Sequence, residues 1–218
     1  MPTARERRER LARARLYFVS DASTPVAVLR AALEGGADML QLRDPSLSDD
    51  ELVEVARAWR SVTREHGALL WLNDRPDLAL RTDADGVHVG QDDMPVADAR
   101  REAGGELLVG LSTHSPEQLE AGIDSGADQL SVGPVWETPT KPGRPAAGLE
   151  YVRHATRREP PVPWFAIGGI DGENVSEVAG AGAERAVVVR AIRDAADPRA
   201  TAAQIKAALE RKTVGAAQ

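Results

Sequence analysis

The chain has 218 residues, of which 42% are hydrophobic and 28% charged, an ordinary composition for one large globular domain. It contains no cysteine, so disulfides, thiolate nucleophiles and zinc–sulfur sites are excluded. The formal net charge of −7 argues against nucleic acid as the main partner. No apolar run approaches the roughly 20 residues of a membrane span and no signal peptide is visible, so we expect a cytoplasmic protein with no membrane partner.

The first 15 residues form a charged segment in which arginines alternate with glutamates. This pattern predicts a solvated helix that leans on the domain. A basic arm for nucleic acid or membrane is the alternative, and the interleaved glutamates disfavour it. We expect the main domain to span residues 16–212 and a short tail to span 213–218.

Strand-like and helix-like segments then alternate along the rest of the chain. The expected strands span 16–20, 39–43, 69–72, 86–89, 107–112, 129–132, 164–167 and 186–189. Between them we expect helices at 25–34, 48–66 and 115–125, others that follow Pro76 and Pro95, one from about Leu149, and a last one from Pro198. Ser48 and Glu51 have the spacing of a capping box, and Ser115 is expected to cap its helix.

Eight strand–helix pairs predict an α/β protein with a (β/α)8 TIM-barrel fold, in a length near the typical value of about 250 residues. A weak repeat supports this count, because Gly36-Ala-Asp38, Gly126-Ala-Asp128 and Gly182-Ala-Glu184 each end a helix before a strand. A doubly wound open sheet is the alternative. No glycine-rich dinucleotide fingerprint follows the first strand, so we predict one closed barrel with an extra N-terminal helix.

Two carboxylates, Asp74 and Asp93, follow consecutive predicted strands. Parallel strands end at the same edge of a sheet and lie roughly 5 Å apart, so the two side chains could share one divalent cation of the oxygen-seeking kind. The alternative is that each carboxylate caps the following helix, which begins through Pro76 or Pro95.

A phosphate site is predicted after the last two strands, where barrels of this class commonly bind phosphate. The backbone N–H groups of Gly168 and Gly169 could point at the oxygens, and Arg190 could add a guanidinium. A glycine turn beside a surface arginine is the alternative. The loop with Thr138, Thr140 and Lys141 offers two hydroxyls and an ammonium to a second phosphate or a diphosphate, unless it is simply a solvated proline-rich loop.

Two histidines lie near these strand ends. His88 is within an apolar strand and is expected to pack the barrel rather than act as a general base. His114 ends its strand and is the better candidate for a titrating group, although it could equally cap its loop. The long loop from Trp136 to Pro145 is the best candidate for a lid.

Seen together, the ordered motifs resemble those of the thiamine phosphate synthase family, from about Tyr17 to Leu209. The motifs are Gln41-Leu-Arg43, Asn73-Asp74, His88-Val-Gly-Gln-Asp-Asp93, Gly110-Leu-Ser-Thr-His114, Gly133-Pro with Thr138-Pro-Thr-Lys141, Ile167-Gly-Gly-Ile170 and Val189-Arg-Ala-Ile192. Their order and spacing together are specific, whereas no single motif decides the matter.

The resemblance implies a Mg²⁺-dependent transferase that joins 4-amino-2-methyl-5-pyrimidinylmethyl diphosphate to a thiazole phosphate, giving thiamine phosphate and diphosphate. It implies that Asp74 and Asp93 hold Mg²⁺. The implied pyrimidine diphosphate site consists of Gln41, Arg43, Asn73, Ser112 and Lys141, with Arg43, Ser112 and Lys141 as the catalytic residues. The implied thiazole phosphate site consists of Thr138, Thr140, Gly169, Val189 and Arg190. No nucleophile is needed if the diphosphate leaves first, because the aminopyrimidine can delocalise the charge until the thiazole nitrogen attacks.

The chain departs from the family pattern at two positions. The family usually has a lysine two residues after the arginine of the second strand, where this chain has Pro45. One diphosphate contact is therefore missing, so either Arg144 or a second metal compensates or the activity is weaker. The family also often has a serine where Arg190 stands, and an arginine can still bind phosphate there.

Two other readings stay open from the sequence. A sister family, the thiazole tautomerases, shares the barrel and lacks that lysine, and His114 would then be the proton carrier. Asp93 and the Thr138–Lys141 loop favour the synthase, since a tautomerase would not need them. The third reading is a non-catalytic phosphate-binding barrel. Small-molecule substrates are the expected partners, and self-association into a homo-oligomer is left open.

Overall fold

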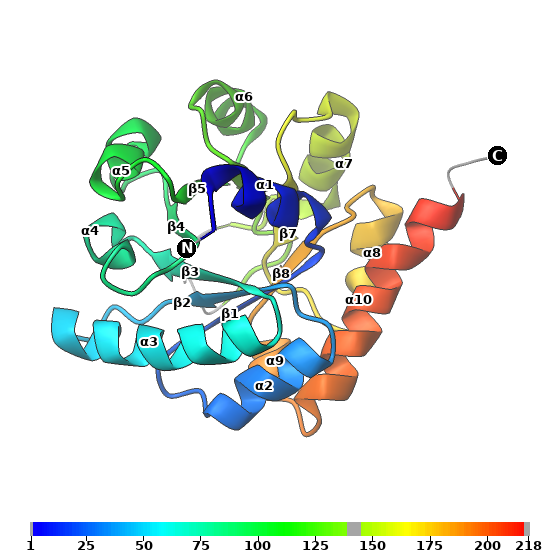
Figure 1. Cartoon of the computed structure of the whole chain (residues 1–218). Coiled ribbons are helices and arrows are strands. Elements are labelled where there is room, and N and C mark those ends of the chain that lie inside the picture. Colours follow the sequence, from blue (N-terminus) through cyan, green and yellow to red (C-terminus); the bar gives the residue numbers. More distant parts are fainter. Residues whose placement is uncertain (1, 139–144, 216–218) are drawn as a thin grey trace.

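The computed structural model describes residues 2–138 and 145–215, and within them eight parallel strands close into a barrel around which the helices are arranged (Figure 1). Each strand pairs with the next in chain order, and β1 also pairs with β8. The strands are β1 (Leu16–Ser20), β2 (Met39–Leu42), β3 (Leu69–Asn73), β4 (Gly86–Val89), β5 (Leu108–Thr113), β6 (Gln129–Val132), β7 (Trp164–Ile167) and β8 (Ala186–Val188). The predicted barrel is confirmed, and the open doubly wound sheet is wrong.

The described helices follow the strands in the expected alternation. They are α1 (Ala4–Arg13), α2 (Val26–Glu34), α3 (Asp49–Glu65), α4 (Pro76–Ala79), α5 (Val96–Glu102), α6 (Pro116–Asp124), α7 (Gly148–Arg158), α8 (Val175–Gly180), α9 (Arg190–Arg193) and α10 (Pro198–Gly215). None of the helices within residues 2–138 and 145–215 is both long and apolar enough to cross a membrane.

Local sequence signals account for several of these helix ends. The Glu51 carboxylate accepts hydrogen bonds from the Ser48 backbone N–H at 2.9 Å and from the Ser48 hydroxyl at 2.6 Å, as the capping-box spacing predicts. The Ser115 hydroxyl accepts from the Gln118 N–H at 3.3 Å at the start of α6. Gly36 follows α2 with a φ of +100°, a left-handed conformation that glycine adopts without steric cost.

The core has two layers, one between the barrel wall and the helices and one inside the barrel. The outer layer consists mostly of Ala, Val and Leu, as the low aromatic content requires. The inner layer contains Tyr17, Trp71 and Phe165, with ring centroids 6.1 Å apart for Tyr17–Trp71 and 5.7 Å apart for Tyr17–Phe165. These aromatic rings fill the barrel below its C-terminal end, so the interior is packed rather than hollow.

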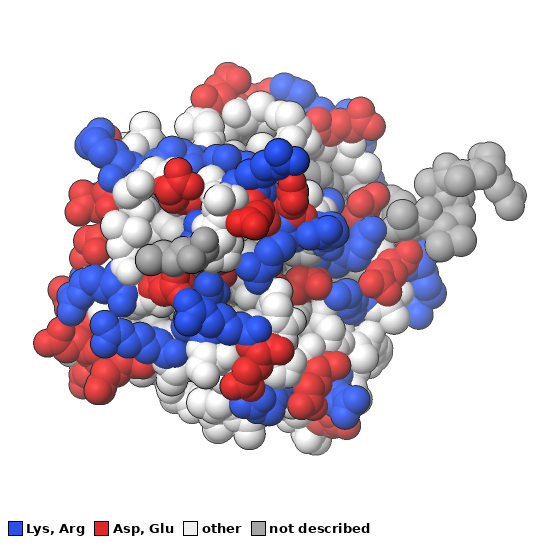
Figure 2. All heavy atoms as spheres, viewed as in Figure 1, with Lys and Arg blue, Asp and Glu red and all other residues white. Residues whose placement is uncertain are grey.

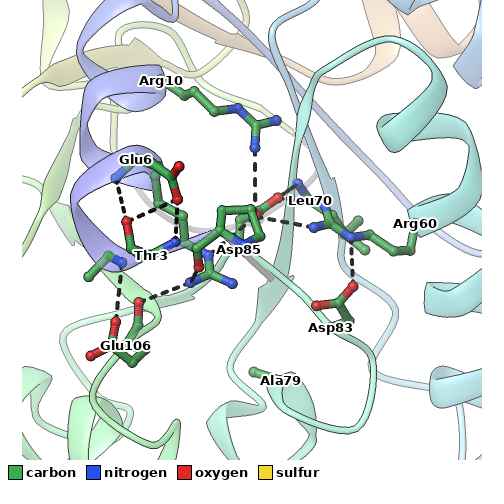
Figure 3. Close-up of polar contacts among 12 residues, drawn as sticks. Thr3, Glu6, Arg10, Arg60, Leu70, Ala79, Asp83, Asp85 and Glu106 are labelled. Atoms are coloured by element: carbon green, nitrogen blue, oxygen red, sulfur yellow. Dashed lines mark hydrogen bonds and ion pairs between the residues drawn. The ribbon is translucent and has the colours of Figure 1, made fainter.

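Helix α1 covers the N-terminal end of the barrel, and buried side chains anchor it there. Arg7 and Leu11 are both only 1% exposed, and Leu11 belongs to the core inside the barrel. The Arg7 guanidinium donates to the buried Asp85 at 3.3 Å, and Arg60 donates to the same carboxylate from α3 at 2.7 Å (Figure 3). The expected solvated helix that leans on the domain is confirmed, since most of its residues are exposed; the sequence did not predict the buried ion-pair cluster that holds α1 against the barrel.

A carboxylate precedes three of the strands and binds the backbone of the neighbouring strand. Asp38, Asp85 and Asp128 accept from the N–H groups of Leu16 (3.0 Å), Leu70 (3.0 Å) and Val109 (2.9 Å), respectively. Basic and acidic side chains alternate across this face of the molecule (Figure 2). The N-terminal end of the barrel is thus occupied by structural ion pairs, and chemistry is expected at the opposite end.

Candidate active site

A cavity of about 330 Å³ opens at the C-terminal ends of the strands. Every strand contributes at least one side chain to it, the contributions being Tyr17, Gln41, Asn73, His88, Ser112, Ser131, Ile167 and Val187 in order from β1 to β8. The loops after β6, β7 and β8 add Thr138, Gly168, Gly169 and Arg190. The lining combines polar side chains with apolar ones such as Ile167 and Val187, which suits a ring-shaped ligand that carries phosphate groups.

Most of the residues predicted to bind substrate line this cavity. From the pyrimidine diphosphate set, the lining includes Gln41, Arg43, Asn73 and Ser112; from the thiazole phosphate set, it includes Thr138, Gly169, Val189 and Arg190. Thr140, Lys141 and Arg144 lie outside the described residues, as does most of the candidate lid. The barrel topology therefore brings together residues as distant in sequence as Gln41 and Arg190.

At the base of the cavity, Gln41 bonds to a buried tyrosine that sequence reasoning did not select. The Gln41 amide donates a short hydrogen bond to the Tyr17 hydroxyl. Tyr17 is 1% exposed, and burial raises its pKa well above the ordinary value, so the phenol stays neutral. The position of Gln41 is thus set by a neutral partner in the layer below it.

His88 and Ser112 form a pair in the wall of the cavity. The His88 Nε2 and the Ser112 Oγ lie 2.9 Å apart, and the His88 Nδ1 lies 3.1 Å from the Gln129 Oε1. Both ring nitrogens are engaged and His88 is 7% exposed, which agrees with a packed barrel residue. The sequence did not indicate that this packed residue would contact a predicted catalytic serine.

The turn after β7 brings backbone close to the cavity. Gly168 and Gly169 have φ values of +106° and +68°, and a Cβ on Gly168 would lie 2.5 Å from the Cα of Pro134. Only glycine fits at Gly168, so the turn can pass against the β6 loop without a clash. Peptide N–H groups of this turn can approach a phosphate in the cavity, because no side chain of Gly168 or Gly169 intervenes.

Arg43 and Arg190 stand on either side of β1 at the rim of the cavity. Within residues 2–138 and 145–215, neither guanidinium lies within 4.0 Å of a carboxylate, whereas Arg193 pairs with Asp21 at 2.9 Å. Both arginines also line a second hollow that contains Pro45, the position where the family pattern has a lysine. Two cations are therefore available to anionic ligands in spite of the missing lysine.

Asp74 and Asp93 are exposed at the rim and do not line the cavity itself. The residues that cap α4 and α5 are Arg75 and Pro95, so the alternative in which the two carboxylates serve as helix caps is wrong. The Asp93 Oδ2 accepts from the Gly90 N–H at 2.8 Å, and the Asn73 amide donates a short hydrogen bond to Asp74. Asp74 has a φ of +58°, a left-handed conformation that aspartate and asparagine adopt more often than other residues except glycine.

Asp74 and Asp93 could supply two ligands to Mg²⁺, but they could not by themselves complete the coordination of a metal ion. Within the described ranges, no group of three or more His, Asp or Glu side chains is arranged to hold a metal ion. Two carboxylates whose remaining ligands come from phosphate oxygens and water are the usual arrangement for Mg²⁺ at a nucleotide-like diphosphate. The residues present therefore suit a cation that binds together with its substrate.

His114 lines the cavity from the end of β5. Its Nδ1 lies 2.6 Å from the Gly133 carbonyl oxygen, and its backbone N–H donates to the Gln118 side chain at 2.8 Å. A carbonyl oxygen can only accept, so Nδ1 carries a proton. The ring is thus held to the loop after β6. These contacts agree with the loop-capping role, one of the two roles that the sequence left open for His114.

The chain is similar in sequence to a known protein family and to several of its members. Residues 16–192 match the family model described as thiamine monophosphate synthase. The chain is 48% identical over 204 residues to the thiamine-phosphate synthase of Acidothermus cellulolyticus, covering 91% of this chain and 96% of that protein. It is 49% identical to the thiamine-phosphate synthase of Thermobifida fusca, covering 91% of this chain and 94% of that protein. The thiamine-phosphate synthase of Synechocystis is longer, and the chain spans 59% of it at 47% identity.

Solved structures give the same picture. The thiamine phosphate pyrophosphorylase of Pyrococcus furiosus superimposes with a TM-score of 0.84 at 34% identity, covering 94% of this chain and 98% of that one. A 3-hexulose-6-phosphate synthase superimposes with a TM-score of 0.65 at 24% identity, covering 89% of this chain and 99% of that one. This second likeness concerns the fold alone.

Proposed function

This chain belongs to the thiamine monophosphate synthase family, whose transferase activity it shares, and we propose how its site performs the reaction. The two substrates are 4-amino-2-methyl-5-pyrimidinylmethyl diphosphate and a thiazole phosphate, and the products are thiamine phosphate and diphosphate. The carbon–oxygen bond between the pyrimidine methylene and the diphosphate breaks, and a bond from the same carbon to the thiazole nitrogen forms. The site must neutralise the leaving group and orient two rings.

In this proposal the pyrimidine lies in the barrel mouth between β2 and β5. Gln41, Asn73 and Ser112 line that side of the cavity, and Gln41 is fixed from below by Tyr17. These groups are uncharged and point from rigid strands, so they suit a neutral heteroaromatic ring with several hydrogen-bonding atoms.

The diphosphate is assigned to the rim beside Arg43. A guanidinium at this position can bind two phosphate oxygens at once, and within the described ranges it has no carboxylate partner that would compete. Lys141 is proposed as the second cation. Asp74 and Asp93 would hold Mg²⁺ here, and the ion when bound would neutralise charge that accumulates on the departing diphosphate.

The thiazole phosphate is assigned to the opposite side, beside the glycine turn. The proposed binding groups are Gly169, Val189 and Arg190, together with Thr138 and Thr140 of the loop after β6. Gly169 and Arg190 belong to adjacent strand ends, which is where this class of barrel commonly binds a phosphate. The pyrimidine and the thiazole would then face each other across the cavity, with the reacting carbon and nitrogen between them.

The order of steps follows from the residues near the proposed pyrimidine site. No cysteine exists in the chain, and the one buried histidine there, His88, has both ring nitrogens engaged by protein groups. No protein nucleophile is required if the diphosphate leaves before the new bond forms. We propose that the diphosphate leaves first, because the 4-amino group can delocalise the positive charge, and that the thiazole nitrogen then attacks the methylene carbon.

One observation supports the proposal: Arg43 on one side and Gly169 with Arg190 on the other, the groups proposed to bind the two phosphate-bearing substrates, line one cavity in a chain whose relatives are thiamine-phosphate synthases. The test is incubation of the purified chain with both substrates and Mg²⁺, with thiamine phosphate and diphosphate measured by chromatography. Both products should appear in equal amounts and only with both substrates. A thiazole tautomerase or a non-catalytic barrel would give neither product.

A further inference from the structure

Four buried side chains form a hydrogen-bonded chain inside the barrel, and three of them, His88, Ser112 and Ser131, line the cavity of the candidate active site. The Ser131 Oγ accepts from the Gln129 Nε2 at 3.0 Å, the Gln129 Oε1 lies 3.1 Å from the His88 Nδ1, and the His88 Nε2 lies 2.9 Å from the Ser112 Oγ. None of the four residues is more than 9% exposed. The chain runs from Ser131 on β6 to Ser112 on β5, and both serines line the cavity.

The direction of these hydrogen bonds decides what Ser112 can offer to a ligand. Gln129 directs its amide nitrogen at Ser131, so its carbonyl oxygen faces His88. Because that oxygen only accepts, Nδ1 carries a proton, and in a neutral imidazole the lone pair is then on Nε2. The Ser112 hydroxyl then donates to Nε2, and only its oxygen lone pairs remain for a ligand in the cavity. If the Gln129 amide were rotated by 180°, each hydrogen bond in the chain would run in the opposite direction. The tautomer of His88 therefore shows which direction the chain has.

A glycine on the intervening strand leaves the space that this arrangement needs. A Cβ on Gly110 of β5 would lie 2.4 Å from the Gln129 Oε1 and 2.5 Å from the His88 Nδ1. No ordinary side-chain carbon approaches polar atoms that closely. Gly110 has no left-handed φ that would otherwise call for glycine. The absence of a side chain at Gly110 thus leaves the space in which His88 and Gln129 contact each other.

We propose that His88, oriented by Gln129, is a positioning residue that makes Ser112 an obligate hydrogen-bond acceptor for an N–H group of the substrate. The inference rests on the proposed function, in which Ser112 faces the pyrimidine. Diphosphate oxygens are themselves acceptors and cannot satisfy Ser112 in this state. The exocyclic amino group is the only N–H donor that the two substrates carry, so Ser112 is assigned to it.

This assignment has a kinetic consequence. As the diphosphate departs, positive charge spreads onto the amino group and makes its N–H a stronger donor. The hydrogen bond to Ser112 therefore strengthens in the transition state more than in the substrate complex. An interaction of that kind raises kcat rather than lowering KM. Disturbing the orientation of Ser112 should reduce kcat while leaving the KM for the pyrimidine diphosphate nearly unchanged.

The test changes Gln129, which is not itself proposed to contact substrate. It is hydrogen-bonded to His88, which in turn contacts Ser112. Gln129→Met keeps the shape but removes the acceptor, so His88 can place its proton on Nε2 and the Ser112 hydroxyl turns toward the cavity as a donor. We expect kcat to fall by about tenfold to a hundredfold, the worth of one charge-assisted hydrogen bond. Gln129→Glu keeps an acceptor opposite Nδ1, and the Ser131 hydroxyl can rotate to donate to it, so kcat should recover to within a few-fold of the parent.

The ranking of the two variants separates positioning from packing. If Gln129 only filled space, Met would be tolerated and Glu would be worse, because a buried carboxylate is costly. Thr113→Val is the matched control: this buried hydroxyl is adjacent to Ser112 in β5 but bonds outward, to the Ser131 carbonyl at 2.9 Å and to Tyr151 of α7 at 2.6 Å. It should lower the melting temperature and leave kcat unchanged.

A direct measurement covers the case in which a Gln129 variant does not fold. Nitrogen-15 NMR of the histidine-labelled parent chain, with the His88 signals identified by their loss in His88→Asn, should show the proton on Nδ1. A proton on Nε2, or parental kcat in Gln129→Met, would overturn the inference. If the parent makes no thiamine phosphate at all, the proposed function fails instead, and the NMR result still decides the direction of the chain.

Discussion

The buried carboxylate Asp85 is predicted to be the most sensitive single position for folding at the N-terminal end of the barrel. It is 0% exposed and accepts from Arg60 at 2.7 and 3.3 Å, from Arg7 at 3.3 Å and from the Leu70 N–H at 3.0 Å (Figure 3). Asp85→Asn removes the negative charge, so the buried Arg7 loses its carboxylate partner and the buried Arg60 retains only Asp83, at 3.3 Å.

The expected loss follows from the burial of the partners. Arg7 is 1% and Arg60 5% exposed, so neither can recover its hydration without local unfolding. Breaking a buried pair by removing one partner typically costs about 3–5 kcal/mol, because an uncompensated charge remains in a region of low dielectric. For a chain of this size, that corresponds to a fall in melting temperature of roughly 6–20 °C.

The assay is urea denaturation followed by circular dichroism, together with thermal unfolding. Glu9→Gln serves as the control, since Glu9 pairs with Arg5 on the same helix at 2.9 Å but with side chains 54% and 87% exposed, and it should cost less than about 1 kcal/mol. Adding Arg7→Met to Asp85→Asn should restore part of the loss. A loss below about 1 kcal/mol for Asp85→Asn would refute the reasoning, and kcat of the folded fraction should not change because the site is at the other end.

Three further outcomes are expected. Asp74→Ala or Asp93→Ala should abolish Mg²⁺-dependent product formation while the chain still folds, because both side chains are exposed; normal turnover in both variants would contradict the metal assignment. Pro45→Lys should lower the KM for the pyrimidine diphosphate by up to about fivefold, the worth of one exposed ion pair, and an unchanged KM would mean that other cations already fill the role. Burial raises the pKa of Tyr151 to about 12 and that of Tyr17 well above its ordinary value, so tyrosinate absorbance should be absent at pH 10.5 in the native chain and present in urea. Since these folded pKa values exceed the unfolded value of about 10, the associated stability is fully present below pH 10 and is lost as the pH rises toward 12 and beyond, which denaturation midpoints at pH 9 and 11.5 can measure.

Several features of the molecule could be predicted because they depend on neighbours in sequence. The alternation of apolar strands with helices, the Ser48–Glu51 capping box and the glycine at the end of α2 are local patterns, and each appears in the structure as expected. In a barrel, strand order follows chain order and the loops after the strands gather at one end, so the lining residues Gln41 and Ser112 could be selected from the sequence.

Other features depend on contacts between distant segments, which no local pattern reports. The burial of Arg7 requires Asp85, which lies 78 residues away, and nothing in a run of alternating charges separates that arginine from its exposed neighbours. The sequence could not decide whether Asp74 and Asp93 cap helices either. A carboxylate shortly before a helix that begins with proline is a plausible cap, and only the backbone conformation shows which residue occupies the cap position.

The amino-acid sequence by itself thus determined the barrel, its direction and the set of residues at its C-terminal end, because periodicity and chain order are sufficient for those. Only the tertiary structure decided what each polar side chain faces. His88 is an apolar-strand histidine in the sequence, and it becomes the partner of Ser112 because strands β4, β5 and β6 lie side by side and Gly110 leaves room for Gln129 to reach it. Hydrogen bonds of this kind act over about 3 Å, a distance that is set by the packing of three strands and not by the order of their residues.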